Sequence, residues 1–290
     1  MRSPALLVLA LTISACGGSS RPDSSLPHNE AEPRPALALT PGRTLNPDQQ
    51  ARVAALATTV ASPCGRAHSL RTSLDGDPSC ERAPHAMRYV EHLVSDEVTD
   101  ADVASLYRDR YGTTQLREFD VSRAPLVGAA NSACRLVVFV DYQCPHCAAF
   151  APVLAELETR YGDKISVRHK HFPITKNHLY AFDAAVAAAA ADRQNKFLPM
   201  HLLMLENQQA LTAADLESYA KQVGLDLAAF QRDIASPDLR ALVEGDRAEA
   251  DAAGVDHVPA IYINGRPYTD RLDLPYLSEW VDEQLDVGAN

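Results

Sequence analysis

Two cysteines separated by two residues are the side chains of this sequence best suited to chemistry. The motif Cys144-Pro145-His146-Cys147 directly follows an apolar, largely β-branched run at 136–140, which is typical of a buried strand. Apolar residues at helical spacing follow, so we expect Cys144 at the N-terminus of a helix. Unpaired N–H groups and partial positive charge at such an end stabilise a thiolate. The expected chemistry is therefore thiol-disulfide exchange.

Each residue of the motif has an expected part. Cys144 is the reactive sulfur, and Cys147 is near enough in the chain to close a small disulfide ring with it. Pro145 suits the first helical turn, where its missing N–H costs nothing. A protonated His146 would place a second positive charge near the thiolate and stabilise it. Because a stabilised thiolate stabilises the reduced form, the disulfide becomes a stronger oxidant.

The same spacing also fits a structural disulfide or half of a zinc site. Zinc normally takes four ligands, and the sequence has no second cysteine pair at metal spacing, so we expect no metal. His169, His171 and His178 are close in sequence, but on a strand only the first two share a face. We assign these histidines surface or structural parts, and we expect no cofactor.

Length and charge limit the remaining possibilities. The 290 residues, of which 46% are hydrophobic, suffice for one substantial domain and a smaller one. The net charge of -11, with no cluster of basic residues, argues against nucleic acid as a partner. No stretch is long enough to span a bilayer as a mature helix.

Residues 1–15 resemble a bacterial lipoprotein signal peptide. Arg2 supplies the positive charge, residues 5–13 form a short apolar core, and the segment ending at Cys16 resembles a lipobox. The resemblance implies cleavage before Cys16 and lipid attachment to its sulfur; the alternative is an ordinary secretory signal. In both cases the mature protein meets an oxidising compartment. Because Gly17 replaces the aspartate associated with inner-membrane retention, we expect a lipid-anchored protein of the bacterial cell envelope, facing the periplasm from the outer membrane.

The segment after the signal is predicted to be a flexible tether at 16–45, because it is rich in serine, proline and charged residues and lacks apolar periodicity. Residues 46–120 are predicted to form a small helical module, since Asn46 and Thr99 are suitable caps before apolar runs.

The helical module contains two further cysteines. Cys64 and Cys80 bracket a strong turn signal, and in an oxidising compartment we expect them to form a structural disulfide. The alternative is a second redox pair that relays electrons to Cys144. Cys134 is then left over as a buried thiol, a link to a partner, or an alternative mate for one of the pair.

Residues 121–290 resemble the DsbA-like thiol-disulfide oxidoreductases. Four segments carry the resemblance in the order of the family: Asp141-Tyr142-Gln143-Cys144-Pro145-His146-Cys147, His171-Phe172-Pro173, the alanine-rich run 181–191 before Asn195-Lys196-Phe197, and 254–265 around Pro259. The resemblance implies an α/β protein with a thioredoxin-like fold and a helical domain inserted at about 177–253. The small helical module precedes this fold.

The segment around Pro259 has a specific implied part. The resemblance implies a cis Val258–Pro259 bond that faces the Cys144 sulfur. The bond before a proline is the type in which the cis form has a low free-energy cost. Backbone groups of Val258 would then pair with an extended substrate while its cysteine approaches Cys144. The alternative is a trans proline that starts an edge strand.

One position departs from the family. Many relatives have an acidic residue six positions before the first cysteine, where it accepts a proton from the second sulfur; this chain has Val138. Asp141 is the only close substitute, and it is either catalytic or a solvated loop residue.

The sequence therefore predicts a dithiol oxidase. A thiolate of an exported protein attacks the exposed Cys144 sulfur of a Cys144–Cys147 disulfide, and a second substrate thiol resolves the mixed disulfide. A membrane redox partner is expected to restore the disulfide. The alternatives are a reductase or isomerase that uses the same site, and a non-catalytic docking lipoprotein.

Overall fold

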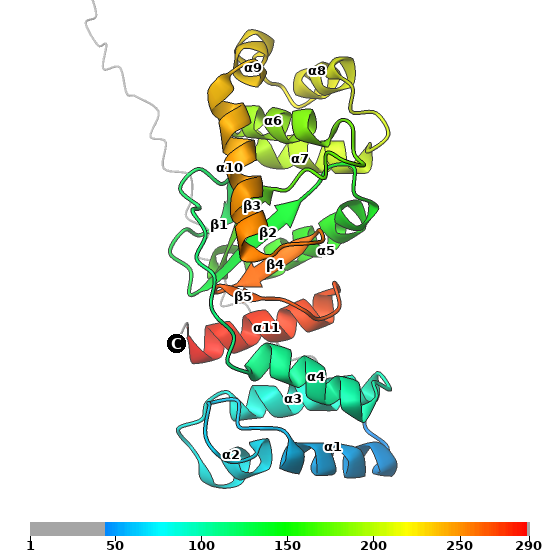
Figure 1. Cartoon of the computed structure of the whole chain (residues 1–290), viewed down its shortest axis with the longest axis vertical. Helices are drawn as coiled ribbons and strands as arrows, with labels where there is room; N and C mark the ends of the chain where they lie inside the picture. The colour runs from blue at the N-terminus through cyan, green and yellow to red at the C-terminus, as the bar shows by residue number, and fades with distance from the viewer. Residues whose placement is uncertain (1–43, 289–290) are drawn as a thin grey trace, which may run out of the picture. The chain divides into compact units, whose positions relative to one another are not determined.

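The computed structural model describes residues 44–288. The predicted signal peptide, the lipid attachment at Cys16 and most of the tether lie outside these residues and stay predictions. The described part begins with the helices α1 (Pro47–Thr59), α2 (Leu70–Gly76), α3 (Ala83–Ser95) and α4 (Asp100–Tyr111) (Figure 1). The Asn46 and Thr99 side chains accept backbone N–H groups at the starts of α1 and α4, so both predicted caps are confirmed.

A mixed sheet follows, in the order β1-β3-β2-β4-β5. Only β2 and β3 pair in parallel, from Cys134 opposite Ile165 to Val140 opposite His171, and the other neighbours are antiparallel. The strands are β1 (Leu126–Gly128), β2 (Cys134–Val140), β3 (Ile165–His171), β4 (Ala260–Ile263) and β5 (Arg266–Pro267). Because parallel strands end at the same edge, the residues after β2 and β3 come together there.

The helix that carries the dithiol is α5 (Pro145–Tyr161). Its buried face includes Phe150, Leu154 and Leu157 at the predicted spacing, and Gly162 ends it with a φ of 52°, which favours glycine. A short 3-10 turn, η1 (Gly162–Lys164), then leads into β3.

The insertion is helical throughout: α6 (Ala181–Asp192), α7 (Phe197–Glu206), α8 (Ala213–Gln222), α9 (Leu227–Ile234) and α10 (Pro237–Ala253). The alanines of α6 are buried because α7, α9 and α10 pack against this helix. Lys170 of β3 holds α10 in place, since its Nζ lies 2.9 Å from Asp246 Oδ1 and 2.5 Å from Glu249 Oε2.

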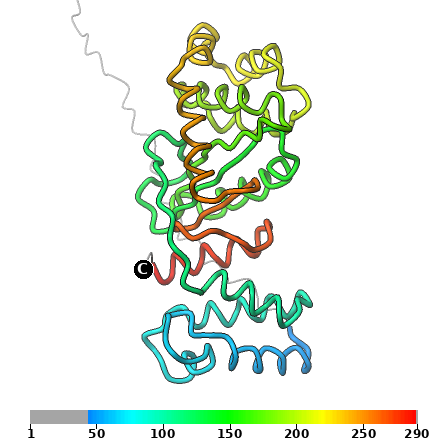
Figure 2. The backbone as a smooth tube through the Cα atoms, viewed as in Figure 1, coloured from blue at the N-terminus to red at the C-terminus, as the bar shows by residue number. Residues whose placement is uncertain are grey.

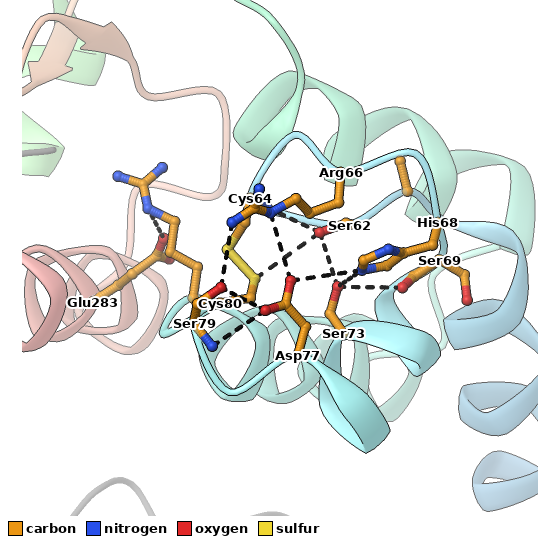
Figure 3. The surroundings of a disulfide bond; sticks show 12 residues. Ser62, Cys64, Arg66, His68, Ser69, Ser73, Asp77, Ser79, Cys80 and Glu283 are labelled. Carbon is orange, nitrogen blue, oxygen red and sulfur yellow. Dashed lines mark hydrogen bonds and ion pairs between the residues drawn. A yellow bond between two sulfur atoms is a disulfide. The ribbon is translucent and has the colours of Figure 1, made fainter.

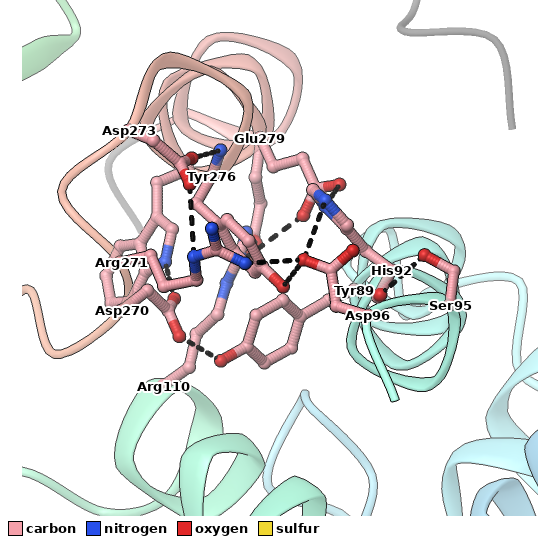
Figure 4. A network of polar contacts seen from close by, with 12 residues as sticks. Tyr89, His92, Ser95, Asp96, Arg110, Asp270, Arg271, Asp273, Tyr276 and Glu279 are labelled. Atoms are coloured by element: carbon pink, nitrogen blue, oxygen red, sulfur yellow. Dashed lines mark hydrogen bonds and ion pairs between the residues drawn. The ribbon is translucent and has the colours of Figure 1, made fainter. Parts of the chain in front are cut away.

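The last helix, α11 (Leu274–Val287), packs on β2, α5 and α3. Figures 1 and 2 place α11 and the insertion helices on opposite sides of the sheet. A polar network joins α11 and the turn before it to α3 and α4 (Figure 4): Tyr89 and Trp280 both donate to Asp270, and the Arg110 guanidinium lies over the Tyr89 ring at 4.4 Å. The helical module and α11 therefore share a buried polar contact.

Candidate active site

Cys144 occupies the N-cap of α5, where β2 gives way to the helix. Its carbonyl oxygen accepts the backbone N–H groups of Cys147 at 3.0 Å and Ala148 at 3.2 Å, and Pro145 is the first helical residue. Both motif cysteines are free thiols, with Cys144 6% exposed and Cys147 1% exposed. Cys144 is the more accessible sulfur, but it is less exposed than predicted, so a substrate cysteine has to reach into the site.

The two thiols have opposite electrostatic surroundings. A hydrogen bond from the Cys147 thiol, together with the backbone N–H groups of Cys147 and His146, lowers the pKa of Cys144 to about 5. The same hydrogen bond and burial raise the pKa of Cys147 far above its ordinary value. Cys144 is therefore the thiolate of the pair, and Cys147 holds a proton.

His146 contributes to the site through its backbone. Its N–H lowers the pKa of Cys144, and His146 is an exposed residue. The effect of a protonated His146 side chain on the thiolate stays a prediction.

The loop before β4 meets the Cys144 sulfur. The Val258–Pro259 peptide bond is cis, so the alternative of a trans proline is wrong. The carbonyl oxygen of Val258 lies 3.5 Å from Cys144 Sγ, and Val258 is 5% exposed. The backbone edge implied by the family resemblance is therefore present beside the reactive sulfur.

Asp141 is part of the site and not a solvated loop residue. It is 1% exposed, and its carboxylate accepts the N–H groups of Gln143 at 2.6 Å and Ile174 at 2.6 Å and the Nδ1 of His178 at 2.8 Å. Its own N–H donates to Cys147 Sγ at 3.4 Å. Val138, where the family resemblance leads us to expect an acidic residue, is fully buried. The backbone of Asp141 thus contacts the Cys147 sulfur, and the charge of Asp141 is among the causes that raise the pKa of Cys147.

Two glutamines to which the sequence analysis gave no role fix the loop before α5. Gln208, just after α7, donates from Nε2 to the carbonyl oxygens of Tyr142 at 2.9 Å and Cys144 at 2.8 Å. Gln143 Oε1 accepts the N–H of Tyr180 at 2.6 Å. No sequence pattern marks Gln208, because its contacts span more than sixty residues. The insertion therefore holds the main chain of the reactive cysteine.

Three buried histidines lie behind this loop. His169 and His201 have ring centroids 5.0 Å apart, and His201 Nδ1 is 2.9 Å from the Tyr142 hydroxyl. Burial lowers the pKa of His171 and of His201, which favours uncharged rings. Among residues 44–288, no group of three His, Cys, Asp or Glu side chains is arranged to hold a metal ion.

The remaining cysteines lie away from the dithiol motif in the chain. Cys64 and Cys80 form a disulfide in the helical module, and the Ser62 and Asp77 side chains lie near it (Figure 3). Cys134 at the start of β2 is fully buried, and burial with the nearby Asp282 charge raises its pKa to about 12. Cys134 is therefore a buried, protonated thiol and not the mate of either disulfide cysteine.

Residues 121–283 match the thioredoxin family. The chain belongs to this family. The match covers more than half of the sequence and includes the dithiol motif, Val258 and Pro259. The helical module before residue 121 lies outside the matched region.

Solved structures of DsbA-like proteins share the fold. A thioredoxin-like oxidoreductase from Silicibacter pomeroyi DSS-3 is 24% identical with a TM-score of 0.52, covering 57% of this chain and 96% of its own. The thiol-disulfide exchange protein alpha-DsbA2 from Wolbachia pipientis is 24% identical with a TM-score of 0.52, covering 65% and 97%. The predicted fold, thioredoxin-like with a helical insertion, is confirmed.

Curated relatives are Na(+)/H(+) antiporters. The protein NhaA 1 from Mycobacterium sp. (strain KMS) is 31% identical over 157 residues, which is 53% of this chain and 26% of the antiporter. The chain thus spans about a quarter of the length of such relatives. In the described part of this chain, no helix is long and apolar enough to cross a membrane.

Proposed function

We propose that this protein is a dithiol oxidase, with a Cys144–Cys147 disulfide as the oxidant. One observation carries the proposal: the pKa of Cys144 is lowered to about 5, whereas that of Cys147 is raised. A thiolate that is stable at neutral pH favours the reduced dithiol, which makes the disulfide oxidising.

The reaction begins when a substrate thiolate attacks Cys144 Sγ of the disulfide. A bond forms between the substrate sulfur and Cys144, the Cys144–Cys147 bond breaks, and Cys147 leaves and takes up a proton. A second substrate thiolate then attacks the first substrate sulfur, and Cys144 leaves as a stable thiolate. Two electrons pass to the protein, and the substrate gains one disulfide.

The backbone at Val258 supports the approach of a substrate. Its carbonyl oxygen is 3.5 Å from Cys144 Sγ, so an extended segment paired with Val258 and Pro259 would bring its cysteine to the reactive sulfur. Binding the main chain of a substrate rather than its side chains suits an enzyme that accepts many proteins. We propose exported proteins with reduced cysteines as the substrates.

We also propose a location and a recycling partner. The lipobox-like segment ending at Cys16 supports a lipid-anchored protein in the bacterial envelope that faces the periplasm, at the outer rather than the inner membrane. A membrane redox partner would reoxidise the dithiol.

The reduction potential of the purified protein tests this proposal. After equilibration with glutathione, a potential well above that of glutathione supports an oxidase, and a much lower one supports a reductase or isomerase. A Cys147→Ser variant should accumulate a mixed disulfide at Cys144 when given a disulfide peptide, because the resolving thiol is absent. A protein that exchanges with no model dithiol would instead be a docking module.

A further inference from the structure

A pocket opens beside the loop that meets the reactive sulfur. Its volume is about 300 Å³, at the lower end of the range for small-ligand sites. Its lining includes residues 255–257, directly before the Val258 carbonyl that contacts Cys144, and Ala260. An extended chain advances about 3.3 Å per residue. A side chain within about two positions of a cysteine bound at Cys144 can therefore reach this pocket.

Another wall of the pocket comes from the segment that connects the helical module to the sheet. Thr114, Gln115 and Arg117 line the pocket, and they precede residue 121, where the match to the thioredoxin family begins. The N–H of Arg117 donates to the carbonyl oxygen of Gly265 at 2.8 Å. A Cβ at position 265 would lie 2.6 Å from the Arg117 carbonyl oxygen, so this approach requires a glycine. The connection from the helical module thus adds to the family fold a wall of its own.

Two donors in the pocket have no partner. Within residues 44–288, the guanidinium of the half-buried Arg117 makes no hydrogen bond or ion pair. Tyr262 is 6% exposed, and its hydroxyl makes no hydrogen bond, yet this oxygen is not among the fully enclosed atoms that lack a partner. The hydroxyl is therefore open to the pocket that Tyr262 lines. Burial raises the pKa of Tyr262 and the charge of Arg117 lowers it, which places the guanidinium near this side chain.

The acidic residue of the lining is already paired. Asp256 Oδ1 lies 2.7 Å from His257 Nδ1, and these side chains are 88% and 76% exposed. The Asp256 charge raises the pKa of Tyr262 less than burial does. A guanidinium only donates hydrogen bonds, and a phenol hydroxyl can donate one more. Such a pair of donors suits an acceptor with two oxygens and a negative charge, which is a carboxylate.

We propose that Arg117 and Tyr262 bind an acidic side chain of the substrate, within about two residues of the cysteine that attacks Cys144. This inference rests on the proposed function, because it names the exported proteins that the same site prefers. The carboxylate accepts hydrogen bonds from the guanidinium and from the hydroxyl. The net charge of -11 repels acidic chains at long range, so the preference is a local contact.

Oxidation of matched peptides tests the pocket. The peptides carry two cysteines and differ only in Glu or Gln beside one of them, in separate pairs for the two sides. We expect the preferred Glu peptide to have a kcat/KM about 10-fold above that of its Gln partner, through a lower KM. Arg117→Gln should bring this ratio near one. Tyr262→Phe keeps the ring and should reduce the ratio about threefold.

Arg135→Gln is the matched control. Arg135 is exposed, and it lines a neighbouring pocket rather than this one, so the ratio should stay at the parent value. Equal rates for the Glu and Gln peptides in the parent protein, or a ratio that survives Arg117→Gln, would overturn the inference. An equal loss of the ratio in Arg135→Gln would do the same, because overall charge would then explain it.

Failure of the proposed function gives a different result. In that case the parent protein oxidises neither peptide. The Cys147→Ser variant then decides the pocket, because it forms a mixed disulfide at Cys144 with each peptide supplied as its glutathione disulfide. The Glu peptide should react about 10-fold faster than the Gln peptide, and equal rates would contradict the assignment.

Discussion

The Sγ atom of Cys144 lies 3.5 Å from the carbonyl oxygen of Val258, which is 114 residues further along the chain. The Cys147 thiol and the backbone N–H groups at the start of α5 stabilise the Cys144 thiolate, and the distant loop supplies a backbone edge beside it. Neither alone makes an exchange site, because a thiolate needs a substrate held in line. The chemistry of this protein depends on the joining of these two segments by the sheet.

The lowered pKa of Cys144 predicts how the stability of the reduced protein depends on pH. Its pKa is about 5 in the folded state and about 8.5 in an unfolded chain. A depressed pKa contributes stability that is fully present above the unfolded value and is lost as pH falls toward the folded value. Lowering the pH from about 8 to about 5 should therefore destabilise the reduced form relative to the oxidised form.

Urea unfolding of both redox forms measures this difference. Cys147 adds little over this window, because its raised pKa keeps it protonated in the folded state and the ordinary value of about 8.5 keeps it mostly protonated in the unfolded chain. If the difference between the unfolding midpoints of the two forms does not change with pH, Cys144 is not a stabilised thiolate.

Gln208 is predicted to hold the loop before α5. A Gln208→Ala change removes the donor to the Tyr142 and Cys144 carbonyl oxygens and should lower the free energy of unfolding by about 1–2 kcal/mol. Gln209→Ala is the matched control, because Gln209 is the exposed neighbour. Denaturant titration compares the two, and equal effects would mean that Gln208 has no structural part.

The buried ion pair between α4 and α11 predicts strong coupling of the helical module to the thioredoxin fold. The side chains of Arg110 and Glu283 are 2% and 3% exposed, and their charged atoms lie 2.8 Å apart. Glu283→Gln removes the carboxylate that lies nearest the buried guanidinium, leaving Asp270 and Glu279 as its acidic neighbours, and should cost about 3 kcal/mol. At the exposed pair with Arg71, Asp75→Asn should cost less than about 1 kcal/mol. Similar unfolding energies for both variants would contradict this account.

Much of this architecture is encoded locally and could be predicted. A β-branched run before Cys144, an apolar stripe after it, and capping side chains at Asn46 and Thr99 each act over a few residues. The cis bond before Pro259 was implied by the family resemblance, since the local sequence alone also allows a trans proline.

The contacts that complete the site could not be predicted. Asp141 is buried because Ile174 and His178 arrive from beyond β3, and Gln208 arrives from beyond α7. Such contacts depend on how distant segments pack, and they leave no periodic pattern in the sequence. The local environment of Asp141 therefore allowed a solvated loop residue as well as a catalytic one.

The disulfide of the helical module is predicted to be structural. It closes a loop across a sequence separation of 16, so a Cys64→Ser, Cys80→Ser double variant should lose about 3 kcal/mol of stability. The double variant should oxidise dithiothreitol at the same rate as the parent protein. A large fall in that rate, with the fold intact, would favour the alternative in which this pair relays electrons to Cys144.

The titration of Cys144 tests the central claim most directly. The thiolate absorbance of the reduced protein, with Cys144→Ser as the blank, should rise with a midpoint near the pKa of about 5. A midpoint near the ordinary thiol value of about 8.5 would contradict the account, because the disulfide would then have no reason to be oxidising.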